Sequence, residues 1–208
     1  MPGEAAKRFL YPSTVALEAL ARASAAAAKV RAAALGLSTY ASFRVDRRRA
    51  LAQYVAPLHP IDKEFLTSLL IGLDGALKAA GEAVEAITAY LSIVEGAARN
   101  SGVRGADRLA KASKALLLRY KALAAARVRL GAAYNRWLAA GQPKDPQVAE
   151  MAVEAIRKAL NFGLYAPVAV EEVTAVAREL GLLGRFKEVP QLGEPAGFSG
   201  PEEGSSPS

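Results

Sequence analysis

The residues of this chain best suited to chemistry are its arginines and lysines, and they are distributed unevenly along the sequence. Residues 1–60 carry nine Lys or Arg against three Asp or Glu, and residues 103–144 carry ten against one. Two other segments are acidic. Residues 61–102 carry six Asp or Glu against three Lys or Arg, and residues 145–208 carry ten against five. Basic blocks that alternate with acidic ones indicate an anionic polymer as partner, further copies of the chain, or both.

The first basic block contains three consecutive arginines, with Tyr40, Phe43 and Tyr54 among its charges. Arginine binds phosphate oxygens in a bidentate manner, and an aromatic ring can pack against a sugar or a base. We therefore predict that this block binds nucleic acid. The predicted binding residues are Lys7, Arg8, Arg22, Lys29, Arg31, Arg44, Arg47, Arg48 and Arg49.

The second basic block lies on a long helical pattern whose only acidic residue is Asp107, so compensation by i,i+4 ion pairs is missing. At 100° per residue its cations spread over one side of the helix, and either nucleic acid or the acidic surface of a neighbouring subunit would fit them. These cations are Arg104, Arg108, Lys111, Lys114, Arg119, Lys121, Arg129 and Arg136. Arg127 falls inside the apolar stripe instead, where it needs a carboxylate or a partner molecule.

Several kinds of catalytic and metal site are missing from the sequence. There is no Cys, and His59 is the single histidine, so neither a Cys–His nucleophile pair nor a zinc site of His and Cys can form within one chain. Phosphate-binding glycine motifs are absent as well. The acidic pairs Glu82 with Glu85, Glu150 with Glu154 and Glu171 with Glu172 fit solvated helix faces better than an acid–base pair. We expect no enzyme, metal, cofactor or small-molecule substrate.

Periodicity and capping residues predict an all-α protein. Helices are expected over residues 14–35, 62–99, 103–140, 145–161 and 170–180, with an extended connector at 37–45 and a short helix at 46–54. No run of eighteen apolar residues is present, so no membrane span is expected. From Leu66 to Ala98 apolar residues follow a 4-3-4-3 spacing, a heptad seam that could lie within the chain or between chains.

The expected architecture is a helical bundle built on a long antiparallel helix hairpin, preceded by a basic N-terminal helical arm. The hairpin follows from the short turn between the second and third expected helices. We divide the chain into an Ala-rich basic arm at 1–60, a helical bundle at 61–183 and a Gly/Pro/Ser/Glu-rich tail at 184–208. The composition of that tail is typical of a disordered segment.

In architecture the chain resembles the α-helical major coat proteins of rod-shaped and filamentous viruses that infect hyperthermophilic archaea. The resemblance rests on the Ala-rich basic segments 13–36 and 46–54, the proline-broken joint 57–60 and the bundle after it. It implies a structural protein of the virion whose arm wraps double-stranded DNA without reading sequence, while the bundle packs against copies of itself or a paralogous coat subunit in a filament. The acidic tail has no counterpart in that pattern.

Other interpretations remain open at this stage. The chain could be a helical subunit of a ribonucleoprotein, which would prefer single-stranded RNA or an RNA–DNA hybrid. It could also be a protein–protein scaffold without nucleic acid, dimerising through the heptad seam, or a bundle enzyme with buried carboxylates and a bound metal. Outside a virion, the expected location is cytoplasmic.

Overall fold

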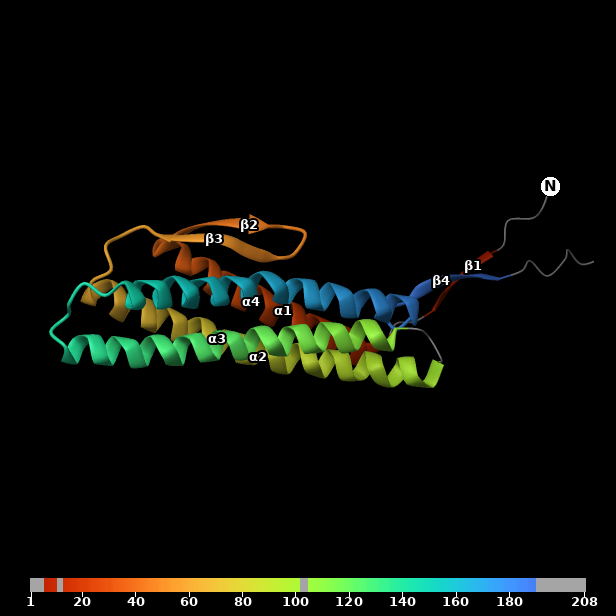
Figure 1. Ribbon diagram of the computed structural model, residues 1–208. Coiled ribbons are helices and arrows are strands. Elements are labelled where there is room, and N and C mark those ends of the chain that lie inside the picture. The colour runs from red at the N-terminus through yellow and green to blue at the C-terminus, as the bar shows by residue number, and fades with distance from the viewer. Residues whose placement is uncertain (1–5, 11–12, 102–104, 190–208) are drawn as a thin grey trace, which may run out of the picture.

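The computed structural model describes residues 6–10, 13–101 and 105–189, and it is mostly helical (Figure 1). Within these ranges four long helices lie side by side: α1 (Thr14–Gly36), α2 (Lys63–Ser101), α3 (Ala106–Ala139) and α4 (Pro146–Glu179). Two antiparallel strand pairs accompany them, β1 (Ala6–Leu10) with β4 (Arg185–Val189) and β2 (Ala41–Asp46) with β3 (Leu51–Pro57). The prediction of a mostly helical chain is confirmed, whereas the two strand pairs were not predicted and the chain is not purely α-helical.

Side-chain contacts define how the helices run. Arg127 on α3 binds Asp74 on α2, and Tyr134 hydrogen-bonds Thr67 with 2.7 Å between the hydroxyl oxygens. Because the residue number falls on α2 as it rises on α3, these two helices are antiparallel. In the same way α1 runs opposite to α2, where Lys29 binds Glu82 and Leu37 lies beside Gly72.

The first helix is an integral part of the bundle. Ser13 caps α1 by accepting the N–H of Ala16 at 3.4 Å, as its position before the helix predicts. One face of α1 is buried against α2 and α4; its residues are Ala16, Ala23, Ala27, Val30 and Ala34. The small side chains let the helices approach closely. A separate basic helical arm is therefore not confirmed, because α1 shares the core of the other helices.

The heptad seam of α2 packs inside this same bundle. Leu66, Leu73, Ala80, Ile87 and Val94 are at most 1% exposed and belong to the common core. Burial of such a row removes apolar area from water at about 25 cal/mol per Å², which makes the seam a main source of stability. The seam is an internal contact, so it does not provide the dimer surface that the scaffold interpretation requires.

The short helix predicted for residues 46–54 is wrong, because these residues belong to the β2–β3 hairpin. Asp46, the first residue of that predicted helix, instead caps the hairpin turn with its carboxylate. Both structures use the same preference of aspartate for nearby backbone N–H groups. The local sequence therefore did not decide between them, and packing of the strands against α4 did.

The two helices predicted for residues 145–161 and 170–180 are one continuous helix, α4, with Pro167 inside it. Gly163 lies between the two predicted ranges, where the sequence suggested a break. It is instead a point of close approach, because a Cβ there would lie 2.5 Å from the Cβ of Ala34 on α1. At its start α4 follows the prediction, since Asp145 accepts the N–H of Gln147 at 2.8 Å and Pro146 is the first helical residue.

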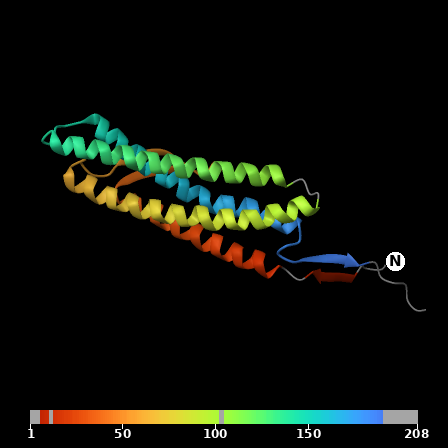
Figure 2. The same ribbon diagram turned by 90° about the horizontal axis from the view of Figure 1, so that it is seen from below.

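At the end of the bundle where α1 begins, β1 and β4 form a ribbon that projects from the helices (Figure 2). The predicted tail is thus wrong over residues 185–189, which form β4, while 190–208 lie outside the described residues. Across residues 13–101 and 105–189, none of the helices combines the length and apolar character needed to span a membrane.

Candidate nucleic-acid interface

The three consecutive arginines lie in the turn between β2 and β3, which we call the arginine turn (Arg47–Arg49). Oδ1 of Asp46 accepts the backbone N–H of Arg48 at 3.0 Å and of Arg49 at 3.2 Å. Oδ2 of the same carboxylate accepts Nε2 of Gln53 at 3.2 Å. The backbone of the turn is thereby fixed, while all three arginine side chains are exposed.

The hairpin that carries this turn is attached to the bundle (Figure 1). Oδ1 of Asn161 on α4 accepts the backbone N–H of Ala52 on β3 at 2.6 Å. Ala41 and Ala52 are buried in the common core, and Tyr40 packs edge-on against Phe65 with 5.7 Å between ring centroids. The arginine turn is therefore held at a defined place on the bundle surface.

Cations from the hairpin and from α4 gather beside residues 157–161 of α4. Arg49 of the turn lines a hollow of about 360 Å³ together with Arg157 and Lys158 of α4. Arg31 of α1 is exposed but lines a different hollow, of about 390 Å³, together with Pro167 and Glu171 of α4, so it does not join these three cations. This arrangement can bind several neighbouring phosphate groups.

The other predicted residues of the first basic block are distributed differently. Arg44 is exposed on β2, close to the turn. Lys29 is bound to Glu82 at 2.5 Å, a hydrogen bond that holds the pKa of Glu82 below its usual value, and Arg22 lies 4.0 Å from Glu18. Lys7 and Arg8 belong to β1 at the far end of α1, which separates them from the hairpin by about 34 Å at 1.5 Å per residue.

The second predicted basic face is not a single free surface. Arg108 binds Glu179 of α4 at 2.8 Å, and the guanidinium of Arg119 lies 3.9 Å from the centre of the Tyr165 ring. The cations that remain exposed on α3 are Lys111, Lys114, Lys121, Arg129 and Arg136. Arg104 lies outside the described residues. Two of the predicted cations therefore stabilise the packing of α3 on α4.

Arg127 finds the carboxylate that its position inside the apolar stripe required. Its Nε and one terminal nitrogen donate to the two oxygens of Asp74 at 2.7 and 2.8 Å, a bidentate pair between α3 and α2. His59, the single histidine, is exposed on the connection between β3 and α2. Neither residue belongs to the interface.

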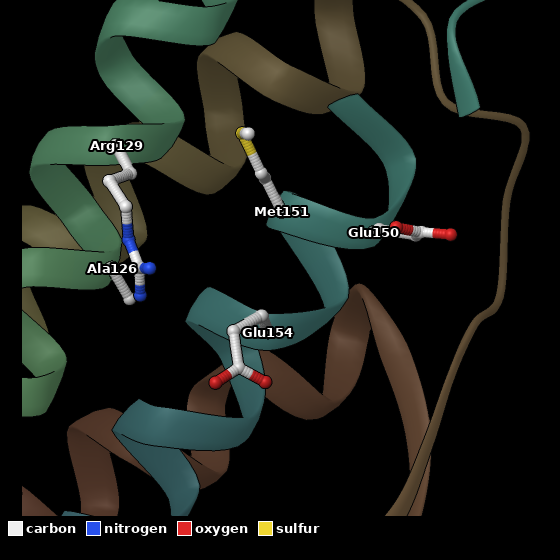
Figure 3. Close-up of a pocket in the computed structure, with 5 residues that line it drawn as sticks. All are labelled: Ala126, Arg129, Glu150, Met151 and Glu154. Carbon is white, nitrogen blue, oxygen red and sulfur yellow. The ribbon is translucent and has the colours of Figure 1, made fainter. Parts of the chain in front are cut away.

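The acidic pair Glu150 and Glu154 does not form an acid–base site. The two side chains point in different directions beside a hollow of about 280 Å³ between α3 and α4 (Figure 3). Burial raises the pKa of Glu154, but hydrogen bonds from Lys158 at 3.0 Å and from Arg157 outweigh it and hold that pKa below the usual value. Among the described residues no group of three or more His, Cys, Asp or Glu could hold a metal ion.

Tyr165 gives the packing of α3 on α4 a signal that can be measured. Burial raises the pKa of Tyr165 to about 12. The negative charge of Glu172 also raises this pKa, whereas the positive charge of Arg119 lowers it. An unfolded tyrosine loses its proton near pH 10.0. Stability from this group is therefore present below pH 10 and is lost as the pH rises towards 12.

We expect Tyr165→Phe to remove one late step from the tyrosinate absorbance titration and to reduce the alkaline loss of stability. An unchanged titration would contradict this.

Arg157, Lys158 and Asn161 line the same hollow as Arg49 and so join the candidate interface, but they were not predicted from the sequence. A pair of adjacent cations in an acidic segment was the available signal, and it has little meaning until the hairpin lies beside it. Asn161 appeared to be a helix end rather than a partner of β3. The chain matches no protein-family model, no curated protein and no solved structure.

Proposed function

We propose that this protein binds nucleic acid through its phosphate backbone, without reading sequence, by means of the arginine turn and the cations beside it on α4. The observation that carries the proposal is the exposed turn Arg47–Arg49, whose backbone is fixed by Asp46. Backbone contacts by Arg and Lys supply most of the affinity of sequence-independent binding. Cations held in place lose less freedom on binding than cations on a free segment.

The surroundings of the turn favour contacts to phosphate over stacking on bases. Tyr40 packs against Phe65, and Phe43 packs against the core, so neither ring is free to take a base. The exposed side chains of the arginine turn itself are three guanidinium groups. A protein with these groups should bind any sequence with similar affinity.

As a biological setting we propose a nucleoprotein assembly, in the first place a virion filament of double-stranded DNA and repeated copies of this chain. Since α1 packs in the bundle, the subunit would lie against the duplex instead of wrapping it with an arm. The same observation favours a second candidate, a helical subunit of a ribonucleoprotein. Which nucleic acid binds most tightly separates the two.

The test is fluorescence-anisotropy binding to a random-sequence DNA duplex, a single-stranded RNA and an RNA–DNA hybrid over a range of salt concentrations. Contacts to four to six phosphates predict a slope of log K against log salt of about −4 to −5 for the duplex. Tighter binding of RNA or of the hybrid would favour the ribonucleoprotein. No binding to any of the three at low salt would overturn the proposal.

A further inference from the structure

The hollow between the hairpin and α4 contains an amide whose orientation is fixed. The backbone N–H of Ala52 can only donate, so the atom of Asn161 that faces it at 2.6 Å must be the carbonyl oxygen. The amide nitrogen of Asn161 is then left on the other side of the group. It makes no hydrogen bond within the described part of the chain, and Asn161 lines the hollow.

The charges around this hollow favour an anion. Arg49, Arg157 and Lys158 line it, against the single carboxylate of Asp46. That carboxylate already accepts two backbone N–H groups and the Gln53 amide, and it lies 3.9 Å from Nε of the largely exposed Arg49, so it has little capacity left for a cation ligand. An incoming anion would therefore meet donors from the turn and from α4 at the same time.

Glu154, which does not line the hollow, forms ion pairs with two of these cations. Its carboxylate binds Arg157 and Lys158 together, the latter at 3.0 Å, and its depressed pKa keeps it ionised at neutral pH. Both cations remain partly exposed and can turn towards the hollow. An anion in the hollow thus competes with Glu154 for them.

We propose that this hollow is a phosphate-binding subsite, formed by the Asn161 amide, Arg49, Arg157 and Lys158, that takes one phosphate of the bound nucleic-acid backbone. The inference rests on the proposed function for the source of the phosphate, whereas the site itself follows from the geometry of the hollow. A phosphate offers several acceptor oxygens, which match donors that converge from two elements. The subsite would seat the backbone against α4 while the rest of the arginine turn binds neighbouring phosphates.

The first test is Asn161→Asp. The new carboxylate still accepts the N–H of Ala52, so the hairpin keeps its attachment, but the hollow loses its amide donor and gains a negative charge. Two ligands are used as probes. Binding of inorganic phosphate is measured by NMR shifts of ¹⁵N-labelled protein, and binding of a random-sequence DNA duplex is measured by fluorescence anisotropy. We expect at least about a tenfold loss of affinity for both. The matched control is Asn135→Asp, the same change at an exposed position of α3, which should lose little.

The second test is Glu154→Gln, which releases Arg157 and Lys158 from their carboxylate. We expect affinity for phosphate and duplex to rise up to about fivefold, the range that release of an exposed ion pair allows. Glu150→Gln makes the same change of net charge one turn away, on a side chain that points elsewhere (Figure 3). An equal rise in both variants would mean that only overall charge matters and would overturn the subsite.

The outcomes separate this subsite from the proposed function. Duplex binding that Asn161→Asp leaves unchanged would overturn the subsite and leave the function standing. Phosphate binding that this variant abolishes, in a protein that ignores every nucleic acid, would overturn the function and assign the hollow to a free phosphate ester. Loss of both ligands in Asn161→Asp alone, with Asn135→Asp unaffected, supports the subsite on the nucleic-acid backbone.

Discussion

Replacement of Arg47, Arg48 and Arg49 together by alanine is expected to lower affinity for a random-sequence DNA duplex about 10²–10³-fold at 0.1 M salt. Each phosphate contact contributes about 0.9 to the slope of log K against log salt, so the loss of three contacts should reduce the slope by about 2.7. The side chains are exposed and Asp46 still caps the turn. Circular dichroism and the melting temperature should therefore remain close to those of the wild type.

The matched control removes three exposed lysines of α3, Lys111, Lys114 and Lys121, and changes the net charge by the same amount. It should reduce duplex affinity by a much smaller factor, because α3 lies away from the hairpin. If the two triple variants lost affinity equally, binding would be a diffuse effect of net charge, and the arginine turn would not be the site. A loss that differed between DNA sequences would argue against contacts to phosphate.

The ends of the helices could be predicted where local chemistry decides them. Ser13 and Asp145 accept backbone N–H groups at the starts of α1 and α4, and Gly141 has a positive φ of 79° just after α3. Such caps depend on a few neighbouring residues and are therefore visible in the sequence. The row of buried leucines in α2 was visible for the same reason, through its period.

Features that depend on a distant segment could not be predicted in this way. Asp46 can cap either a helix or a turn, and the hairpin is favoured by its contacts with the bundle, among them the hydrogen bond of Ala52 to Asn161 on α4. Gly163 interrupts a helical pattern in the sequence, whereas in the fold it lies under α1. In both cases a tertiary contact outweighs a local preference.

Of the candidate site, only the three adjacent arginines of the arginine turn could be predicted from the sequence. Three adjacent arginines indicate an anion partner whatever the fold, and the structure keeps them exposed. The number of cations on a helix does not show which of them are free to bind a partner. Arg119 was predicted as a binding residue, but its guanidinium lies over the Tyr165 ring and stabilises the bundle. Arg157 and Lys158 show the reverse: Glu154 balances them in the sequence, but in the fold they line a hollow with Arg49 of the hairpin and so join the proposed interface.

The close approach of α1 to α4 predicts a large effect from a small substitution. In Gly163→Ala the new methyl group would lie 2.5 Å from the Cβ of Ala34 and 3.2 Å from the carbonyl oxygen of Val30. Neither atom is the end of a flexible side chain, so the two helices must separate. We expect a loss of about 1–3 kcal/mol in the free energy of unfolding, and a larger loss for Gly163→Leu, measured by urea denaturation.

Gly75→Ala provides the control, because Gly75 also lies inside a long helix but nothing lies within 4 Å of a Cβ there. Alanine favours a helix over glycine by about 1 kcal/mol, so this variant should be more stable than the wild type. The same substitution is thus expected to have opposite signs at the two positions. Stabilisation by Gly163→Ala would mean that α1 does not pack tightly on α4. The N-terminal helix would then be free to leave the bundle, as the wrapping arm of a coat protein requires.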